Sequence, residues 1–306
     1  MLNRMSGLLA VFALMFATHI YAEEGNELQV DMESGRGGLP TNIEGLSDFR
    51  VCADFDNLPY SNSKMEGFEN KIAELIAKDL GKTVKYQFWY DRIGFIRNTL
   101  NAHRCDVVMG TVAGNDMMLT TNPYYRSGYV FVYKKSSGFN ITDWDSPDLR
   151  KGKIGVVGQT PPSRPIHDKG LMENARPYRI MRDLNLPPSF IVDDLVKGDI
   201  DIAILWGPIA GYWAKAKYPD QLVVVPAPEY EQENAHGKEQ WNISVGVRKK
   251  DKERLAMIEA ALERNKVAIA KILDDYGIPH IPVVDEKKGK KPAKPKEQGE
   301  IIPKSE

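Results

Sequence analysis

Cysteine and histidine are scarce in this chain, which has 2 cysteines and 5 histidines among 306 residues. His103, His167, His236 and His280 are scattered, without the spacing of a metal site or a paired nucleophile. We interpret them as surface residues, so no histidine chemistry and no metal or other cofactor is expected. The net charge of −1 does not predict the basic surface that nucleic acids require, so no nucleic-acid partner is expected.

Long apolar runs are missing as well. The run at residues 8–16 is shorter than the roughly 20 residues that a bilayer-spanning helix needs. With Arg4 before it and Tyr21-Ala22 ahead of two glutamates, residues 1–22 are expected to be a signal peptide, cleaved near Ala22 on export to the periplasm. An uncleaved anchor is the alternative. No cysteine follows the cleavage point, so neither a lipoprotein nor another membrane anchor is expected.

Alternating strand and helix patterns begin near residue 46. An apolar run at residues 49–54 precedes a helical stripe at 68–80 that Gly81 should end. Residues 84–88 alternate as a strand, a short helix is expected at 95–100, and residues 107–109 form a buried run. This order predicts a parallel sheet covered by helices, with ligands beyond the carboxyl ends of the strands.

A second set of strands and helices predicts a second lobe. Strands are expected at residues 153–158, 178–181, 200–206, 222–225 and 241–248, and helices at 190–196, 210–217 and, as one long helix, 253–276. The chain is expected to cross between lobes near residues 134–140 and to return near 241–247. Such a double crossing forms a hinge with a cleft between the lobes.

The expected division of the chain follows from these patterns and from two polar ends. It comprises a signal peptide at 1–22, a flexible leader at 23–45, the first lobe at 46–136, the second lobe at 137–240, a return to the first lobe with a C-terminal helix at 241–284, and a disordered tail rich in lysine and proline at 285–306.

The two cysteines are expected to form a disulfide. Cys52 falls in the first strand and Cys105 just before the third, and these strands are commonly neighbours in such a lobe. An exported protein meets an oxidising compartment, where an even pair is usually bonded. The alternatives are two separate buried thiols or metal ligation, for which no other local ligand completes a site.

Four segments, FRVCADFDNLPYSN, GFENKIAELIAKDLG, RCDVVMGTVAGN and TTNPYYRSGYVFVYKK, follow one another as in a periplasmic solute-binding lobe. Over residues 46–275 the chain resembles the family 3 periplasmic substrate-binding proteins. With the later DIAILWGPIAGYWAK, it is most similar to the MoxJ and XoxJ subgroup found beside quinoprotein alcohol dehydrogenases, the XoxJ type being preferred. The resemblance implies a type II two-lobed α/β periplasmic binding protein fold and a periplasmic location, without identifying a ligand.

The chain departs from the amino-acid receptors of that family at both ligand anchors. Those receptors hold an α-carboxylate with an arginine after the third strand and an α-ammonium with an aspartate after a later one. Here residues 111–116 contain no arginine, and the later strand ends in Leu205-Trp206-Gly207 without an acid. Because a guanidinium fork is the natural clamp for a carboxylate, a free amino acid is not the expected ligand.

The cleft is instead expected to offer aromatic planes and neutral polar groups. The candidate residues are Asp54, Phe55, Tyr60, Gly110, Thr111, Tyr124, Gln159, Thr160 and Trp206. Such a lining suits a flat or flexible group, for example a cofactor-like ring or a peptide segment. The alternative for the aromatics at 55, 60 and 124 is that they only pack the rim of the lobe.

Four carboxylates in the same region raise a separate possibility. Asp54, Asp56, Glu66 and Glu69 could gather around a hard cation, which prefers oxygen ligands. The alternative is that Glu66 is solvated and that Glu69 is favoured by the dipole in the first turn of its helix.

No enzyme signature is complete. Ser61 and Lys64 fit the spacing S-x-x-K, but the SDN and KTG elements that accompany it in penicillin-recognising enzymes are missing. We therefore expect a non-catalytic protein. The resemblance implies an accessory factor that binds a lanthanide-dependent PQQ methanol dehydrogenase, or its cytochrome c partner, and assists activation or assembly. The alternative is a transport receptor that delivers a small solute other than an amino acid to an ABC permease.

Overall fold

The computed structural model describes residues 47–179, 183, 185–230 and 239–284. The expected signal peptide at 1–22, leader at 23–45 and tail at 285–306 lie outside these residues. Within the described ranges, no helix is long and apolar enough to cross a membrane.

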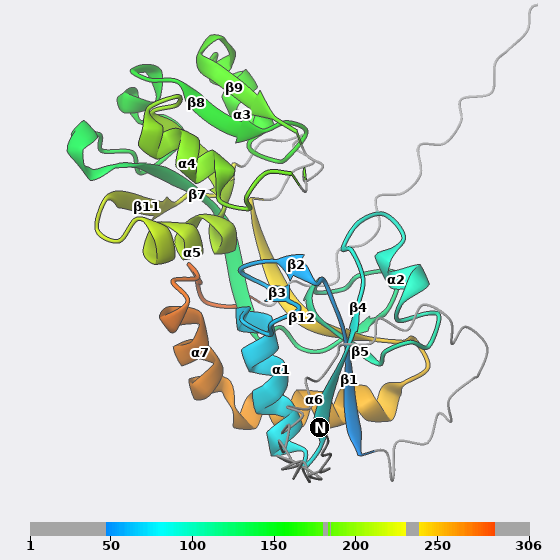
Figure 1. Ribbon diagram of the computed structural model, residues 1–306. Helices are drawn as coiled ribbons and strands as arrows, with labels where there is room; N and C mark the ends of the chain where they lie inside the picture. The colour runs from blue at the N-terminus through cyan, green and yellow to red at the C-terminus, as the bar shows by residue number, and fades with distance from the viewer. Residues whose placement is uncertain (1–46, 180–182, 184, 231–238, 285–306) are drawn as a thin grey trace, which may run out of the picture. The chain divides into compact units, whose positions relative to one another are not determined.

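The first lobe, called lobe I, is built on the predicted parallel sheet (Figure 1). Strand β1 (Asp48–Ala53) pairs in parallel with β4 (Thr83–Phe88) on one side and β5 (Val107–Val112) on the other. Strand β12 (Gln240–Val247) then runs antiparallel to β5, and the short β6 (Leu119–Thr120) pairs with β12. The helices of lobe I are α1 (Phe68–Asp79), α2 (Phe95–Asn98), α6 (Lys252–Arg264) and α7 (Lys266–Asp275), and a small hairpin, β2 (Asp56–Asn57) and β3 (Ser61–Asn62), follows β1.

Both faces of this sheet are buried, as expected for parallel strands. Phe49 and Val51 of β1 share one core with Phe68, Ile72 and other residues of α1, α6 and α7. Cys52 of β1 points to the opposite face, in a smaller core with residues of α2. The helical stripe read from the sequence is therefore the buried face of α1, and Gly81 ends the turn at a φ of +64°.

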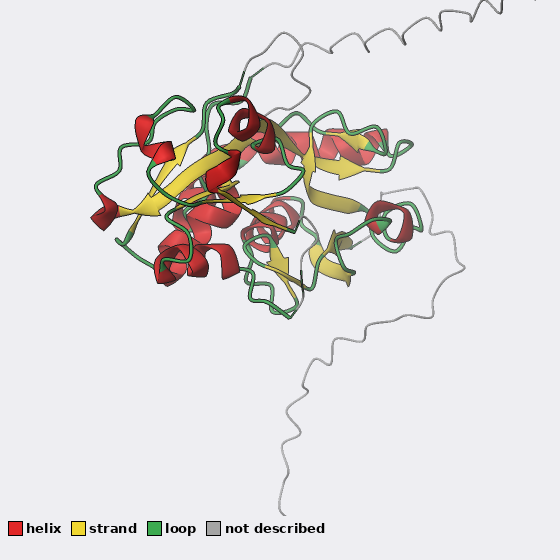
Figure 2. Cartoon of the chain, turned by 90° about the horizontal axis from the view of Figure 1, so that it is seen from above, coloured by secondary structure: helices red, strands yellow, loops and turns green. Residues whose placement is uncertain are grey.

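The second lobe, lobe II, repeats this layered plan. Its strands β8 (Ile154–Val157), β9 (Ala175–Tyr178), β10 (Ile202–Trp206) and β11 (Leu222–Pro226) are accompanied by α3 (Ser163–Asp168), α4 (Phe190–Lys197) and α5 (Gly207–Lys217), with short 3₁₀ helices at Lys135–Ser137, Pro147–Arg150 and Met172–Asn174. Alternate residues of β10 face opposite ways: Ile202 and Ile204 join the core with α3, whereas Ala203 and Leu205 join the core with α4 and α5. Figure 2 shows helices on both sides of these strands.

One long strand belongs to both sheets. In β7 (Tyr125–Lys134), residues 125–128 pair with β12, and residues 129–134 pair with β10 and β11. The change of partners at Gly128 and Tyr129 lies several residues before the crossing expected near 134–140. The domain division at residue 136, which lies in the 3₁₀ helix after β7, remains a prediction.

The long helix expected at residues 253–276 is wrong. It is two helices, α6 and α7, that meet at Asn265, whose φ of −106° departs from helical geometry. The Asn265 amide donates to the Ala261 carbonyl oxygen at 2.8 Å. Because apolar residues keep the helical period on both sides of Asn265, periodicity alone could not reveal the break.

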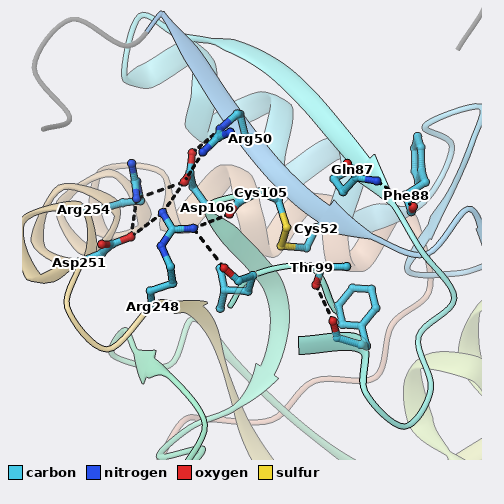
Figure 3. Close-up of a disulfide and its surroundings, with 12 residues drawn as sticks. Arg50, Cys52, Gln87, Phe88, Thr99, Cys105, Asp106, Arg248, Asp251 and Arg254 are labelled. Atoms are coloured by element: carbon cyan, nitrogen blue, oxygen red, sulfur yellow. Dashed lines mark hydrogen bonds and ion pairs between the residues drawn. A yellow bond between two sulfur atoms is a disulfide. The ribbon is translucent and has the colours of Figure 1, made fainter. Parts of the chain in front are cut away.

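The expected disulfide joins Cys52 of β1 to Cys105 before β5, with a Cα–Cα distance of 5.3 Å. An ion cluster lies beside it (Figure 3). Asp106, which is 3% exposed, accepts hydrogen bonds from Arg50 at 2.7 and 2.8 Å and from Arg248, and Arg254 lies 3.4 Å away. Arg248 also donates to the Cys105 carbonyl oxygen. The covalent and ionic links therefore join β1, β5 and the segment after β12.

Candidate functional site

Two cavities lie beside Asn57 and Trp206, which line both of them. The first, called the acidic cavity, has a volume of about 330 Å³. It is lined by Cys52, Ala53, Asp54, Asn57, Tyr60, Ser61, Glu69, Asp91, Phe95, Val108, Gly110, Val112, Tyr125, Trp206 and Ile243. All but Trp206 come from lobe I. The cavity therefore lies at the carboxyl ends of β1 and β5, where the parallel sheet was expected to place a ligand.

The turn after β1 and the first turn of α1 form one wall. The backbone N–H groups of Phe68 and Glu69 donate to the carbonyl oxygens of Pro59 and Tyr60, at 2.8 and 3.1 Å. Gly67 permits this approach, because a Cβ at that position would collide with the Tyr60 carbonyl. These contacts turn Glu69 toward the sheet.

Glu69 has an unusual environment for a carboxylate. It lies against Gly110 of β5, where even a Cβ would overlap its carboxylate. Its carboxylate makes no hydrogen bond or ion pair with any residue in the described part of the chain. Withdrawal from water, together with the charge of Asp91, raises its pKa from 4.5 to about 8. The helix dipole favours a charged carboxylate in the first turn, but burial and the Asp91 charge have the larger effect on the Glu69 pKa.

The neighbouring Asp54 is held differently. It is buried, and its carboxylate accepts the backbone N–H groups of Asp56 and Asp91 at 2.9 and 2.8 Å. These bonds fix the loop after β4 against the end of β1. Asp91 itself is exposed at the rim of the cavity. The acidic cavity therefore gathers three carboxylates, of which only that of Asp54 accepts hydrogen bonds from residues that the structure describes.

Aromatic side chains complete the acidic cavity. The Tyr60 ring lies 5.5 Å from that of Phe68, and Phe68 packs edge-on against Tyr125. Burial, with a smaller effect of the Glu69 charge, raises the pKa of Tyr60 well above its ordinary value. Trp206 enters from the end of β10 and makes edge contacts with Tyr129 and Trp241. The phenol groups are therefore neutral, and the described residues that line the cavity provide aromatic rings but no cationic side chain.

The second cavity, called the apolar cavity, has a volume of about 250 Å³. Most of its lining comes from lobe II, including Val157, Phe190 and Leu205. Thr160 also lines it and donates to the Val157 carbonyl oxygen at 2.6 Å. Trp206 therefore separates an apolar space from an acidic one.

The nine predicted cleft residues are distributed unevenly. Asp54, Tyr60, Gly110 and Trp206 line the acidic cavity, and Thr160 lines the apolar cavity with Trp206. The remaining four line neither cavity. The Phe55 ring centroid lies 4.1 Å from that of Tyr90, and the Tyr124 hydroxyl donates to the Met109 carbonyl oxygen. The Thr111 hydroxyl accepts a hydrogen bond from the Asn115 side-chain amide, and Gln159 is exposed at a φ of +64°. A ligand-binding role for the nine residues remains a prediction.

The structure adds cavity residues that the predicted list lacked. Asp91 and Tyr125 line the acidic cavity, and so does Glu69, which had been considered only as a ligand of a hard cation. Of the other acids considered with it, Asp56 is exposed, and Glu66 accepts from the Asn62 amide at 2.7 Å. Among the described residues, no group of three or more histidine, cysteine, aspartate or glutamate side chains has the arrangement of a metal site.

The raised pKa of Glu69 predicts that stability falls as pH rises. Its folded pKa of about 8 exceeds the ordinary 4.5, so its contribution is complete below about pH 4.5 and is lost as pH rises through about 8. Glu69→Gln should abolish this loss, which we expect to be about 2 kcal/mol because the cavity admits some water. Denaturant unfolding at a series of pH values measures it. Glu74→Gln, on the exposed face of α1, is the control, and equal pH slopes for wild type and Glu69→Gln would contradict the assignment.

Comparisons with known proteins agree with this architecture. Residues 49–278 match the sequence profile of the bacterial extracellular solute-binding proteins, family 3. Protein MoxJ of Methylorubrum extorquens is 31% identical over 247 residues, covering 76% of this chain and 82% of that protein. The crystal structure of MxaJ from Methlophaga aminisulfidivorans MPT is 31% identical, with a TM-score of 0.67 over 76% of this chain and 100% of that one. The periplasmic binding protein XoxJ from Methylobacterium extorquens AM1 is 33% identical, with a TM-score of 0.64 over 77% of this chain and 100% of that one.

Proposed function

Because the chain belongs to the family 3 bacterial extracellular solute-binding proteins, we propose that it is a non-catalytic periplasmic protein that binds a PQQ methanol dehydrogenase and assists its activation or assembly. The observation that carries the proposal is its likeness to MoxJ, MxaJ and XoxJ over about three quarters of the chain. Membership of the family indicates the fold, and the likeness to MoxJ, MxaJ and XoxJ is what points to a methanol dehydrogenase as the partner.

The cavity chemistry supports a protein partner over an amino acid. No lysine, arginine or histidine is among the described residues that line the acidic cavity, so a ligand carboxylate would meet Glu69 and Asp54 without a guanidinium to hold it. Trp206 and Tyr60 are partly exposed aromatics beside the two cavities. Aromatic anchors at the edge of a pocket are typical hot spots of protein interfaces.

The lanthanide-dependent dehydrogenase is the proposed enzyme within this class. The identities of 31% to MxaJ and 33% to XoxJ do not separate the two types, so the preference for the XoxJ type rests on the sequence segments alone. Parallel titrations with a lanthanide-dependent and a calcium-dependent dehydrogenase would distinguish them. Tighter binding of the calcium enzyme would reverse the preference.

Truncation of the cavity aromatics should weaken the complex. We expect Trp206→Ala or Tyr60→Ala to cost more than about 1 kcal/mol of binding free energy, because each would remove a large ring from a site that binding desolvates. The measurement is calorimetric titration of each variant with the purified dehydrogenase. Trp213→Ala is the matched control, because Trp213 lies in α5 and lines neither cavity.

The outcomes separate the two candidate functions. If the dehydrogenase binds and both variants bind as well as the wild type, the interface lies elsewhere on the lobes. If the dehydrogenase fails to bind at micromolar concentration while a small solute binds, the protein acts as a transport receptor. That second reading retains support from the complete two-lobed plan with cavities beside Trp206.

A further inference from the structure

The acidic cavity has an unbalanced charge. Glu69, Asp54 and Asp91 are the carboxylic acids among the described residues that line it, and none of these described residues has a cationic side chain. The Asp54 carboxylate is satisfied by two backbone N–H groups. Glu69, by contrast, has neither an ion-pair partner nor a hydrogen-bond donor in the described part of the chain. A partly buried carboxylate without a partner is costly to a folded protein.

The surroundings of Glu69 explain which partner would suit it. Tyr60, Tyr125, Phe95 and Trp206 also line this cavity, and the electron-rich faces of such rings attract cations. The combination of unpaired carboxylates and aromatic faces is selective for a positively charged group with apolar substituents. An anion would be repelled by the three acids.

We propose that the acidic cavity is a binding site for a small organic ammonium cation, held by Glu69 and by the aromatic side chains that line the same cavity. This inference goes beyond the proposed function and does not depend on it, because the site belongs to the free protein. Unlike the free amino acids that amino-acid receptors bind, the proposed ligand carries no carboxylate.

A bare metal ion fits the cavity less well. Among the described residues, no cluster of potential ligands has the arrangement of a metal site, and the Asp54 carboxylate already accepts two backbone N–H groups. The volume of about 330 Å³ lies at the lower end of ligand pockets in proteins, about 300–1,000 Å³. It is large for one ion and suitable for an ammonium group with several carbon atoms.

Binding of a cation should be coupled to loss of the Glu69 proton. The titratable groups near Glu69 are Asp54 at the end of β1, Asp91 after β4, Tyr60 before α1, Tyr86 in β4, and Tyr124 and Tyr125 at the start of β7. Burial raises the pKa of each of these tyrosines above its ordinary value, so they stay neutral. The pKa of Glu69, about 8, is therefore the one that a bound cation would lower across neutral pH.

The test is a calorimetric titration of the purified full-length protein, without dehydrogenase, at constant ionic strength. The probes are tetramethylammonium and propylammonium, two cations that differ in their hydrogen-bonding capacity. Trimethylglycine adds a carboxylate to the tetramethylammonium frame, and 2-methyl-2-propanol is a neutral molecule of similar shape. We expect saturable binding of at least one cation, weaker binding of trimethylglycine, and no binding of the alcohol.

Substitutions then locate the site. Glu69→Gln should weaken cation binding about tenfold or more, because it removes the charge that faces the ligand. Asp91→Asn, at the exposed rim, should weaken it by a smaller factor and serves as a second variant if Glu69→Gln folds poorly. Glu74→Gln, an exposed change on the same helix, should bind like the wild type.

The pH profile provides a signature that a merely structural glutamate would not produce. The affinity for tetramethylammonium, whose charge does not titrate, should rise by up to tenfold per pH unit below about pH 8 and level off above it, and this rise should disappear in Glu69→Gln. Failure of both cations to bind at tens of millimolar, or equal affinities of wild type and both acid variants, would overturn the proposal. Because the dehydrogenase is absent from this titration, neither result bears on the proposed partner.

Discussion

Loss of the Cys52–Cys105 disulfide is expected to lower the free energy of unfolding by about 4 kcal/mol, because the bond closes a loop with a sequence separation of 53 residues and so restricts the unfolded chain. For a domain of this size, the loss corresponds to a fall in melting temperature of about 10 °C. The measurement is thermal and denaturant unfolding of the oxidised wild type and of the double variant Cys52→Ala with Cys105→Ala.

The effect can be separated from the loss of two buried side chains. Cys52 and Cys105 are 3% and 0% exposed, so the alanine substitutions also remove packing contacts. The reduced wild type, unfolded in the presence of a thiol reductant, keeps both sulfur atoms and is the matched control. Reductant should destabilise the wild type and leave the double variant unchanged. Equal unfolding midpoints for the oxidised and reduced wild type would contradict this account.

Neutralisation of Asp106 is the second change with a large expected effect. Asp106→Asn should lower the free energy of unfolding by about 4 kcal/mol, because it removes the negative charge that pairs with Arg50, Arg248 and Arg254 and leaves these three cations close together. Removing one partner of a buried ion cluster is strongly destabilising even where the cluster as a whole contributes little. The measurement is urea unfolding at neutral pH, with near-ultraviolet circular dichroism to verify the native fold.

The pH dependence of the same variant provides an independent check. Burial alone would raise the Asp106 pKa, but hydrogen bonds from Arg50 and Arg248 and the charge of Arg254 outweigh it and lower that pKa below 3.8. A depressed folded pKa contributes stability above the ordinary pKa and loses it as the pH falls through the folded value. The wild type should therefore lose its advantage over Asp106→Asn in acid.

A surface pair is the matched control for the ion cluster. Asp79 pairs with Arg264 on the exposed side of α1 and α6, where water screens the interaction. Asp79→Asn should change stability little. If it destabilises as much as Asp106→Asn, the ion cluster beside the disulfide has no special role.

Local patterns were sufficient for most of the architecture. The spacing of Phe68, Ile72 and Ile76 predicted α1, because a single buried face repeats with the helical period. The order of strands and helices predicted the parallel sheet, since parallel neighbours need a crossover between them. The same order brought Cys52 of β1 beside Cys105, which lies just before the adjacent strand β5.

Local patterns failed where distant parts of the chain decide the outcome. Strand β7 was not recognised as one element, because it owes its ten-residue length to partners from both lobes. The break at Asn265 left the apolar period intact on either side. Neither feature has a strong signature in the residues that form it.

The candidate site divides in the same way. Asp54, Tyr60 and Gly110 could be anticipated because Asp54 and Tyr60 come after β1 and Gly110 lies toward the end of β5, and the carboxyl ends of these strands meet at one edge of the sheet. The environment of Glu69 could not, because its first-turn position in α1 predicts a solvated, dipole-stabilised carboxylate. The sequence alone thus determined most of the elements, their order and the edge of the sheet where the acidic cavity lies, since these depend on neighbouring residues. Only the tertiary structure placed Glu69 over Gly110 among aromatic rings, because the solvation and charge around a side chain are set by residues far away in the chain.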